Sequence, residues 1–308
     1  MTDEILIVGS GAMATLFAAR LSSAGFRVSI LGTWLEGLNA YQHSGARLIN
    51  TDGSEHVFPV DVISSDHHSK KFRFAIILVK SWQTRLTANT MVKWLEDDGL
   101  CLTLQNGLGN REILEDSLGS KRVVVGVTTT GGTLLEPGRV LSGGEGIITI
   151  EEHAGLEPLV EMLQNAGFKV SLVAEAASLL WGKLVISSAI NPLSAILRVR
   201  NGQLVENPEI SALMAELALE TSSVAGALDV RLPYDDPVEA SLEVARRTAS
   251  NNSSMLQDVL RGAPTEIEAI NGAIWNLGKT QGIATPFNAM MTRLIRAIVS
   301  KSPQNINP

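Results

Sequence analysis

Three polar side chains lie four residues apart in a segment that otherwise reads as a buried helix. The segment "WGKLVISSAINPLSA", residues 181–195, contains Lys183, Ser187 and Asn191 among apolar residues. Residues four apart share one face of a helix, so these side chains would form a polar row along it. An ammonium group in apolar surroundings is costly unless it is paired or used, and it can donate a proton to a reacting oxygen. The alternative is that the lysine stem packs while its ammonium reaches water. Pro192 is expected to end or kink the helix just after the row.

A carboxylate and a hydroxyl further along the chain are the other candidates for chemistry in this half. In "SSMLQDVLRGAPTEIEAING", residues 253–272, Pro264 suits the first position of a helix, and Glu266 then falls in its first turn. Glu266 borders the apolar face of that helix, where it could act on a substrate or simply complement the helix dipole. Ser254 is an isolated serine. From the residues alone, a structural role and a functional role stay open for both.

A glycine-rich turn near the start of the chain has the spacing of a dinucleotide site. The strand-like "EILIVG" runs into a G-x-G-x-x-A turn and then into an amphipathic helix. The first glycine permits the tight turn, the second lets the backbone approach a pyrophosphate, and the small alanine allows close packing of helix on strand. The N–H groups at the start of the helix would face the phosphates. The alternative is a glycine turn without a ligand. The candidate cofactor-binding residues here are Gly9, Ser10, Gly11, Ala12, Met13 and Ala14.

Three more candidates follow strand-like segments, at the ends where ligands bind in parallel sheets. Thr33 follows "RVSILG", at the place where NAD sites often have an acid and NADP sites an arginine. Glu36 lies slightly too far along to be a confident ribose ligand. Lys80 ends "FAIILVK", and Asn106 follows "LCLTLQ". Lysines and Asn-Gly turns also end strands for structural reasons, so a structural role and a functional role stay open for both Lys80 and Asn106.

The elements that must position these residues divide the chain into two halves. Continuous apolar strands alternate with helical segments up to about residue 173, which predicts a doubly wound parallel sheet of Rossmann type. The glycine-punctuated residues 135–150 predict an antiparallel hairpin appended to that sheet. From residue 174 onward the apolar positions follow the period of a helix. We therefore expect a dinucleotide-binding Rossmann domain at 1–173 and an all-helical substrate and catalytic domain at 174–308.

Composition narrows the classes of function. The 308 residues include 25 basic and 32 acidic side chains, a net charge of -7 that argues against nucleic-acid binding. No apolar stretch reaches the roughly 18 residues typical of a membrane helix, and the acidic N-terminus is unlike a signal peptide. We expect a cytoplasmic protein with no membrane partner. Cys101 is expected in the core, and the adjacent His67 and His68 are expected on the surface, so no metal site is predicted.

Taken together, several segments resemble the ketopantoate reductase (2-dehydropantoate 2-reductase) family. They occur in the order of the family and span almost the whole chain. The matching segments are "IVGSGAMA", "ILVKSWQ", "LQNGLGN", "WGKLVISSAINPLSAI", "SSMLQDVLRGAPTEIEAING" and "GIATPFN". The resemblance implies a Rossmann domain followed by a helical domain, and NADPH-dependent reduction of ketopantoate to pantoate on the route to pantothenate.

The resemblance also assigns roles to the candidate residues. It implies that Lys183 is the general acid that protonates the carbonyl oxygen, and that Glu266 is the carboxylate that binds the substrate hydroxyl. Desolvation would lower the pKa of the lysine toward neutrality, which suits that role. The residues implied to hold substrate are Asn191, Ser187, Ser254, at the substrate carboxylate, and Asn106. Besides residues 9–14, those implied to contact the cofactor are Thr33, Lys80, Asn106 and Glu266.

This chain departs from the family pattern at three positions. Ala14 stands where the family commonly has glycine, which the fold tolerates. Thr33 stands where many members carry arginine, so NADH is an alternative to NADPH. Ser187 stands where members often have asparagine, so the pocket could accept a different 2-oxo acid.

Two other functions are weighed against ketopantoate reduction. One is a related two-domain dehydrogenase that acts on a different 2-oxo acid. The other is a dinucleotide-binding sensor without catalysis, which is disfavoured because Lys183 and Glu266 are both present. The apolar helices of the second half could support a homodimer.

Overall fold

The computed structural model describes residues 4–63 and 70–300. Within this part the chain divides into two compact units, and each is described by itself. Of the described residues, the first unit comprises 4–63, 70–105 and 110–176, and the second comprises 106–109 and 177–300. His67 and His68 lie outside the described residues. The short segment 106–109, which the sequence places within the first domain, belongs to the helical unit.

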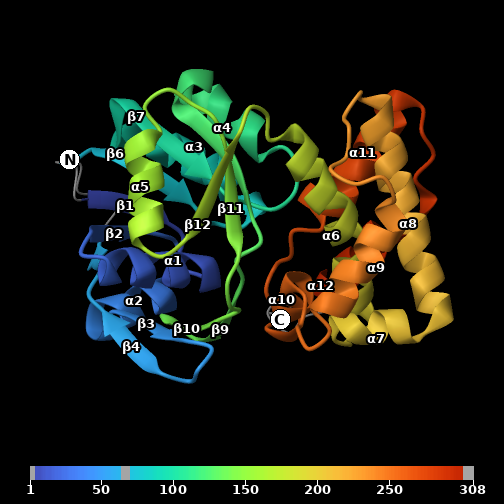
Figure 1. The fold of residues 1–308 in the computed structure, drawn as a ribbon, viewed down its shortest axis with the longest axis horizontal. Helices are drawn as coiled ribbons and strands as arrows, with labels where there is room; N and C mark the ends of the chain where they lie inside the picture. The colour runs from blue at the N-terminus through green and yellow to red at the C-terminus, as the bar shows by residue number, and fades with distance from the viewer. Residues whose placement is uncertain (1–3, 64–69, 301–308) are drawn as a thin grey trace, which may run out of the picture. The chain divides into compact units, whose positions relative to one another are not determined.

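The first unit contains an eight-stranded sheet in which all but one of the pairings between neighbouring strands are parallel, so that β11 and β12 run opposite to the other strands (Figure 1). Its strands follow the order β12-β11-β8-β7-β6-β1-β2-β5, and only the pairing of β11 with β8 is antiparallel. The strands are β1 (Glu4–Val8), β2 (Arg27–Leu31), β5 (Asp61–Val62), β6 (Phe72–Ile77), β7 (Leu95–Thr103), β8 (Val123–Thr128), β11 (Ile147–Glu151) and β12 (Lys169–Val173). The strand order reverses direction at β1 and β6, so a crevice is expected at their carboxyl ends.

Helices cover both faces of this sheet because its strands are apolar on both sides. Ile5 and Ile7 of β1 belong to one apolar cluster together with residues of α1 (Ala12–Ser23) and α5 (Glu157–Asn165). Leu6 and Val8 point to the other face and belong to the cluster that contains residues of α3 (Thr84–Trp94) and α4 (Asn110–Leu118). The predicted doubly wound sheet is confirmed. The remaining helical elements of this unit are α2 (Leu35–Ser44) and the short 3-10 turns η1 (Ser81–Gln83) and η2 (Ser120–Arg122).

The predicted appended hairpin is correct only in part. Strands β9 (Gly132–Glu136) and β10 (Arg139–Ser142) form an antiparallel hairpin, but they belong to a separate four-stranded sheet, β4-β3-β10-β9. The strand that follows, β11, leaves the hairpin and joins the large sheet. Strands β3 (Ala46–Ile49) and β4 (Glu55–Phe58) complete the small sheet, and they and β12 were not anticipated from the sequence. One face of the small sheet packs on the core through Leu48 and Val140.

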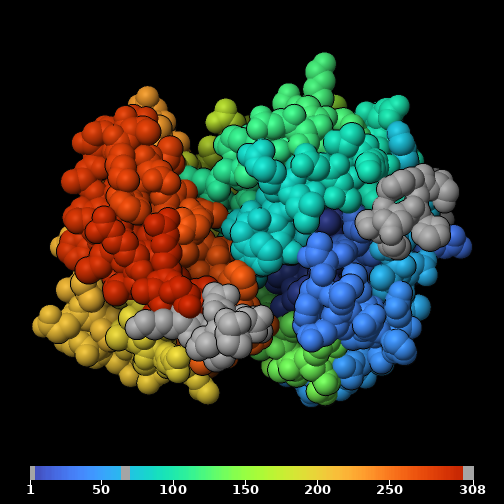
Figure 2. Space-filling model, turned by 180° about the vertical axis from the view of Figure 1, so that it is seen from behind, coloured from blue at the N-terminus to red at the C-terminus, as the bar shows by residue number. Residues whose placement is uncertain are grey.

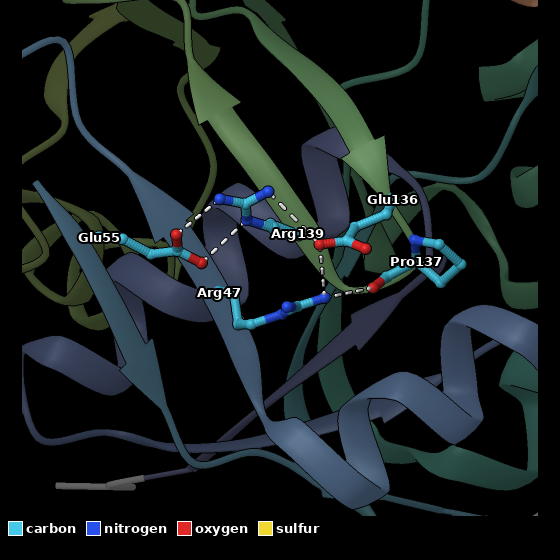
Figure 3. A network of polar contacts seen from close by, with 5 residues as sticks. All are labelled: Arg47, Glu55, Glu136, Pro137 and Arg139. Carbon is cyan, nitrogen blue, oxygen red and sulfur yellow. Dashed lines mark hydrogen bonds and ion pairs between the residues drawn. The ribbon is translucent and has the colours of Figure 1, made fainter. Parts of the chain in front are cut away.

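The other face of the small sheet carries a ladder of paired charges (Figure 3). Arg139 donates two hydrogen bonds to Glu55, at 2.9 and 2.7 Å, and a longer one of 3.4 Å to Glu136. Arg47 pairs with Glu136 at 3.2 Å and donates to the carbonyl of Pro137. The bonds from Arg139 lower the pKa of the Glu55 carboxyl. The arginines of this face are thus paired with its own carboxylates.

The second unit is helical throughout its long segment. Its helices are α6 (Ala177–Leu197), α7 (Asn201–Glu206), α8 (Pro208–Ala227), α9 (Pro237–Arg247), α10 (Ser254–Leu260), the π turn η3 (Glu268–Gly272), α11 (Ala273–Gln281) and α12 (Pro286–Ser300). Helix α6 packs against α8, α9, α10 and α12. Figure 2 shows this unit from behind, where its last helices, coloured orange to red, form much of the surface.

Helix α6 corrects two expectations from the sequence. By length and apolar composition it could cross a membrane, contrary to the expectation that no segment would qualify, but 67% of that window is buried inside the structure, as in a core helix. Pro192 lies inside the helix and does not end it. Because proline has no N–H, the carbonyl of Ser188 loses its helical donor. The amide of Asn271 donates to that carbonyl at 3.0 Å instead, so the helix continues.

A buried carboxylate on α8 fixes the start of α12. Glu220 is 9% exposed and accepts hydrogen bonds from the backbone N–H groups of Phe287 and Asn288, at 2.8 and 2.9 Å. It also accepts from the amide of Asn288, whose oxygen in turn accepts from Asn271. Buried side chains therefore join α8, α12 and the π turn.

We predict that Glu220→Ala lowers the free energy of unfolding by about 3 kcal/mol, because it leaves buried N–H groups without an acceptor. The measurement is urea unfolding followed by circular dichroism. Glu216→Ala is the matched control, since Glu216 is exposed one turn earlier on the same helix. Equal shifts of the unfolding midpoint for the two variants would contradict this role.

Candidate active site

The glycine turn lies where the strand order reverses. Gly9 follows β1, its N–H donates to the carbonyl of Leu31 at 2.8 Å, and its φ is +135°. A Cβ at this position would lie 3.0 Å from the backbone of Leu78, just after the neighbouring strand β6. Both the backbone angle and the close approach thus require glycine here. At Gly11, by contrast, a Cβ would meet nothing within 4 Å, so there is open space beside the turn.

The helix that follows the turn has a start that suits a phosphate. Helix α1 begins at Ala12 directly after Gly11, and among the described residues no side chain caps it. Its first turn contains no acid that would repel an anion. Ser10 and Ala14 are buried, and Ala14 belongs to the core under the sheet, whereas Met13 packs at the edge of that core. The backbone N–H groups of this first turn are therefore the donors that a pyrophosphate would use.

Gln83 joins the two strand ends that carry Thr33 and Lys80. Its amide nitrogen donates to the hydroxyl of Thr33 at 2.8 Å, and its oxygen accepts from the backbone N–H of Lys80 at 3.3 Å. Thr33 is exposed, two residues beyond β2. Glu36, in the first turn of α2, accepts a hydrogen bond from the indole of Trp34 at 3.1 Å. Sequence reasoning missed Gln83, although it lies in the segment "ILVKSWQ" next to Lys80.

Gln105 and Asn106 are neighbours with different surroundings. Gln105 is buried and donates to the carbonyl of Val79 and to the hydroxyl of Thr84, so it ties the ends of β6 and β7 together. Asn106 belongs to the helical unit, where its amide nitrogen donates to the carboxylate of Glu266 at 3.2 Å. Of these two polar residues, Asn106 is the one that reaches a candidate catalytic group.

Lys183, Ser187 and Asn191 lie on α6 as predicted, four residues apart. All three are partly buried, whereas Leu184 and Val185 beside them are buried completely or nearly so. Burial lowers the pKa of the Lys183 ammonium to about 8, and the negative charge of Glu266 acts in the opposite direction. The structure therefore brings a lysine that can give up its proton near neutral pH within electrostatic reach of a carboxylate.

The structure corrects the predicted setting of Glu266. Pro264 and Glu266 precede the helical segment instead of forming its first turn, because the backbone winds into the π turn η3 before α11 begins. The N–H of Gly272 donates to the carbonyl of Ile267 at 2.9 Å, a five-residue step that is typical of π turns. Glu266 is only 5% exposed. This buried carboxylate therefore stands just before a π turn and not in the first turn of an α-helix.

Ser254 begins α10, next to the residue that caps it. The hydroxyl of Ser253 accepts from the N–H of Leu256 at 3.0 Å and also from the hydroxyl of Ser194 at 2.6 Å. Ser194 lies on α6 close to the polar row, so this bond ties the start of α10 to that helix. Ser253 is thus a structural serine that the sequence did not distinguish from Ser254.

The residue before Lys183 also has a specific packing role. A Cβ at Gly182 would lie 2.6 Å from the ring of Pro233, and the hydroxyl of Tyr234 donates to the Gly182 carbonyl at 2.7 Å. Burial raises the pKa of Tyr234 above its ordinary value. The segment around Pro233 thereby packs directly against the turn of α6 that carries the lysine.

Neither an accessible cysteine nor a metal-binding cluster is found among the described residues. Cys101 is completely buried, as expected, and burial raises the pKa of its thiol to about 12. Within 4–63 and 70–300, no group of three or more His, Cys, Asp or Glu side chains is placed to hold a metal ion.

Comparison with known proteins covers both units. Residues 5–155 match the family model described as ketopantoate reductase PanE/ApbA, and residues 175–299 match its C-terminal model. The 2-dehydropantoate 2-reductase of Archaeoglobus fulgidus is 34% identical over 306 residues, which cover 97% of this chain and 98% of the relative. That of Halobacterium salinarum is 31% identical, covering 95% and 98%.

Solved structures give the same result. The PanE/ApbA family ketopantoate reductase of Ralstonia eutropha is similar with a TM-score of 0.90 and 30% identity, covering 97% of this chain and 99% of that one. A D-mandelate dehydrogenase, in complex with NADH and anilino(oxo)acetate, has a TM-score of 0.89 at 24% identity and covers 96% and 98%, a likeness of fold. The resemblance noted in the sequence is confirmed, and this chain belongs to the ketopantoate reductase family of oxidoreductases.

Proposed function

We propose that the protein reduces ketopantoate to pantoate with NADPH, on the route to pantothenate. The observation that carries the proposal is the pair formed by Lys183 and Glu266, a lysine whose pKa is lowered to about 8 and a buried carboxylate that acts on it. Such a lysine can supply the proton that the reduction of a ketone consumes. The names of the relatives, 2-dehydropantoate 2-reductases, support the choice of substrate.

The first unit supports the choice of a nicotinamide dinucleotide as cofactor. Its glycine turn has open space beside Gly11, and the start of α1 has neither a side-chain cap nor an acid in its first turn. Residues 9–14 would hold the pyrophosphate through backbone N–H groups, and Thr33 and Lys80 would lie toward the adenosine ribose. When bound, the reduced nicotinamide supplies the hydride.

The residues of the second unit provide the acid chemistry. Lys183 carries its proton below pH 8 and donates it from Nζ to the oxygen of the ketone as that oxygen becomes an alkoxide. Its positive charge also stabilises the developing negative charge before transfer is complete. Glu266 opposes the loss of the lysine proton and accepts from Asn106, so its carboxylate is held in one orientation where it can accept from a substrate hydroxyl. Asn191, Ser187 and Ser254 would hold the rest of the substrate.

A different 2-oxo acid is the second candidate substrate. Ser187 lies in the polar row one helical turn from Lys183 and is shorter than the asparagine expected there, which favours a larger substrate. The mandelate dehydrogenase of similar fold carries an aryl ligand, anilino(oxo)acetate. Rates with ketopantoate and with benzoylformate, compared side by side, distinguish the two candidates.

The setting of the protein is also a proposal. A cytoplasmic enzyme that binds neither nucleic acid nor a membrane agrees with its net charge of -7 and with the burial of α6. The helical unit could also support a homodimer. Cell fractionation and sedimentation velocity test these two statements.

We predict that Lys183→Ala lowers kcat for the reduction of ketopantoate by about 10²- to 10⁴-fold, because the alkoxide loses its proton donor. Initial rates of NADPH oxidation measure this. Dinucleotide binding, followed by quenching of tryptophan fluorescence, should be retained, since the glycine turn belongs to the other unit. Unchanged turnover in the variant would exclude Lys183 as the acid. Dinucleotide binding by the wild type without turnover of any 2-oxo acid would instead identify a sensor.

A second prediction concerns pH. Lys183 must be protonated to act, and its pKa is lowered to about 8, so activity is present below that value and lost above it. The kcat/KM for reduction should therefore be constant below about pH 7 and fall about tenfold per pH unit above about pH 9. The residual activity of Lys183→Ala should lack this descent. A wild-type profile that stays level across the same range would contradict the assignment.

A third prediction concerns cofactor choice. Thr33 is exposed and neutral, so Thr33→Arg should raise the ratio of kcat/KM for NADPH to that for NADH by about tenfold or more, through a pair with the 2′-phosphate. Thr33→Gln is the matched control, because it lengthens the side chain without adding charge and also removes the hydroxyl that Gln83 contacts. If the arginine and glutamine variants give the same ratio, Thr33 does not face the 2′-phosphate.

A further inference from the structure

The loop Asn106–Gly109 is attached to the π turn by backbone contact. The N–H of Leu108 donates to the carbonyl of Ala269, inside η3, at 2.9 Å. The side chain of Leu108 packs on the apolar cluster of the helical unit that includes Trp181 and Ile270. Two residues before Leu108, the side-chain amide of Asn106 donates to the carboxylate of Glu266 at 3.2 Å. The four-residue loop is thus hydrogen-bonded to the π turn at Ala269 and to Glu266 just before that turn.

Only glycine fits at position 107, between the two residues that make these hydrogen bonds. Gly107 has a φ of +82°, and a Cβ on it would lie 2.4 Å from the carbonyl oxygen of Ala269 and 2.7 Å from its Cβ. The nearest atom is a backbone oxygen within a helical turn, so it cannot move aside as the end of a flexible side chain could. Any side chain at 107 would therefore push the loop away from the π turn and weaken both bonds.

We propose that Gly107 is a positioning residue for the reduction: its contact with Ala269 holds the Asn106 amide on the Glu266 carboxylate. The inference rests on the proposed function. Glu266 acts electrostatically on Lys183. If its carboxylate could rotate, it would spend less time in the orientation that stabilises the lysine charge and accepts from a substrate hydroxyl. The π turn supplies the Ala269 carbonyl that accepts from Leu108 of the loop, in agreement with the frequent occurrence of such turns at functional sites.

The chain contains a matched control for this contact. Gly109 lies in the same loop with a φ of +89°, but a Cβ on it would meet nothing within 4 Å. Gly107→Ala and Gly109→Ala therefore carry a similar backbone strain, and only the first adds a collision with Ala269. Rates are expressed per dinucleotide-binding site, so that loss of folded protein does not count as loss of activity.

We expect Gly107→Ala to lower kcat/KM for ketopantoate by about tenfold to hundredfold relative to Gly109→Ala. If the contact acts through Asn106, the same substitution should have an effect of less than about threefold in an Asn106→Ala background. Equal rates for the two glycine variants would overturn the proposal. A full loss from Gly107→Ala in the Asn106→Ala background would overturn it as well.

Hydrogen exchange separates failure of this proposal from failure of the proposed function. In a peptide that covers residues 106–109, exchange of the Leu108 amide should be about tenfold faster in Gly107→Ala than in Gly109→Ala, because its acceptor is lost. This readout requires no substrate. If the wild type does not turn over ketopantoate, only the proposed reaction is excluded. If the Leu108 amide exchanges equally fast in the two variants, the proposed role of the contact between Gly107 and Ala269 is excluded.

Discussion

The interaction on which the proposed chemistry of the helical unit depends is the one between Lys183 and Glu266. A charged lysine on an apolar helix is costly to bury, and its pKa is lowered to about 8 for that reason. A buried carboxylate from a distant segment of the chain offsets part of this cost. The result is a lysine that stays largely protonated near neutrality yet can release its proton, which is the property that a proton donor in carbonyl reduction needs.

The backbone around this pair is irregular, and side chains from other helices compensate for each irregularity. Pro192 removes one donor from α6, and the amide of Asn271 replaces it at the carbonyl of Ser188. Asn271 lies in the π turn and also donates to Asn288, which Glu220 holds from α8. The same buried network therefore satisfies the broken helix and fixes the turn that follows Glu266. Polar groups in the core thus stabilise a backbone that departs from regular helical geometry.

In the first unit, the candidate site is formed by elements that are consecutive in the chain or adjacent in the sheet. Its glycine turn connects consecutive elements, and the closest contact, between Gly9 and the backbone after β6, arises because adjacent parallel strands end at the same edge of the sheet. Two glutamines reinforce that edge: Gln83 links the ends of β2 and β6, and Gln105 links those of β6 and β7. The candidate site for a dinucleotide is thus built from neighbouring strands, and most of it can be predicted from residues that are close along the sequence.

This difference explains how much could be predicted without a structure. The apolar periods, the G-x-G-x-x-A turn and the four-residue spacing of Lys183, Ser187 and Asn191 determined the doubly wound sheet, the helical half and the polar row, because each depends on residues that are close along the chain. The tertiary structure alone decided that Asn106 donates to Glu266 and that Glu266 precedes a π turn. It also decided that α6 continues beyond Pro192, where Asn271 replaces the missing donor. Each of these depends on hydrogen bonds between residues far apart in sequence, which only the packing of the helices brings within reach.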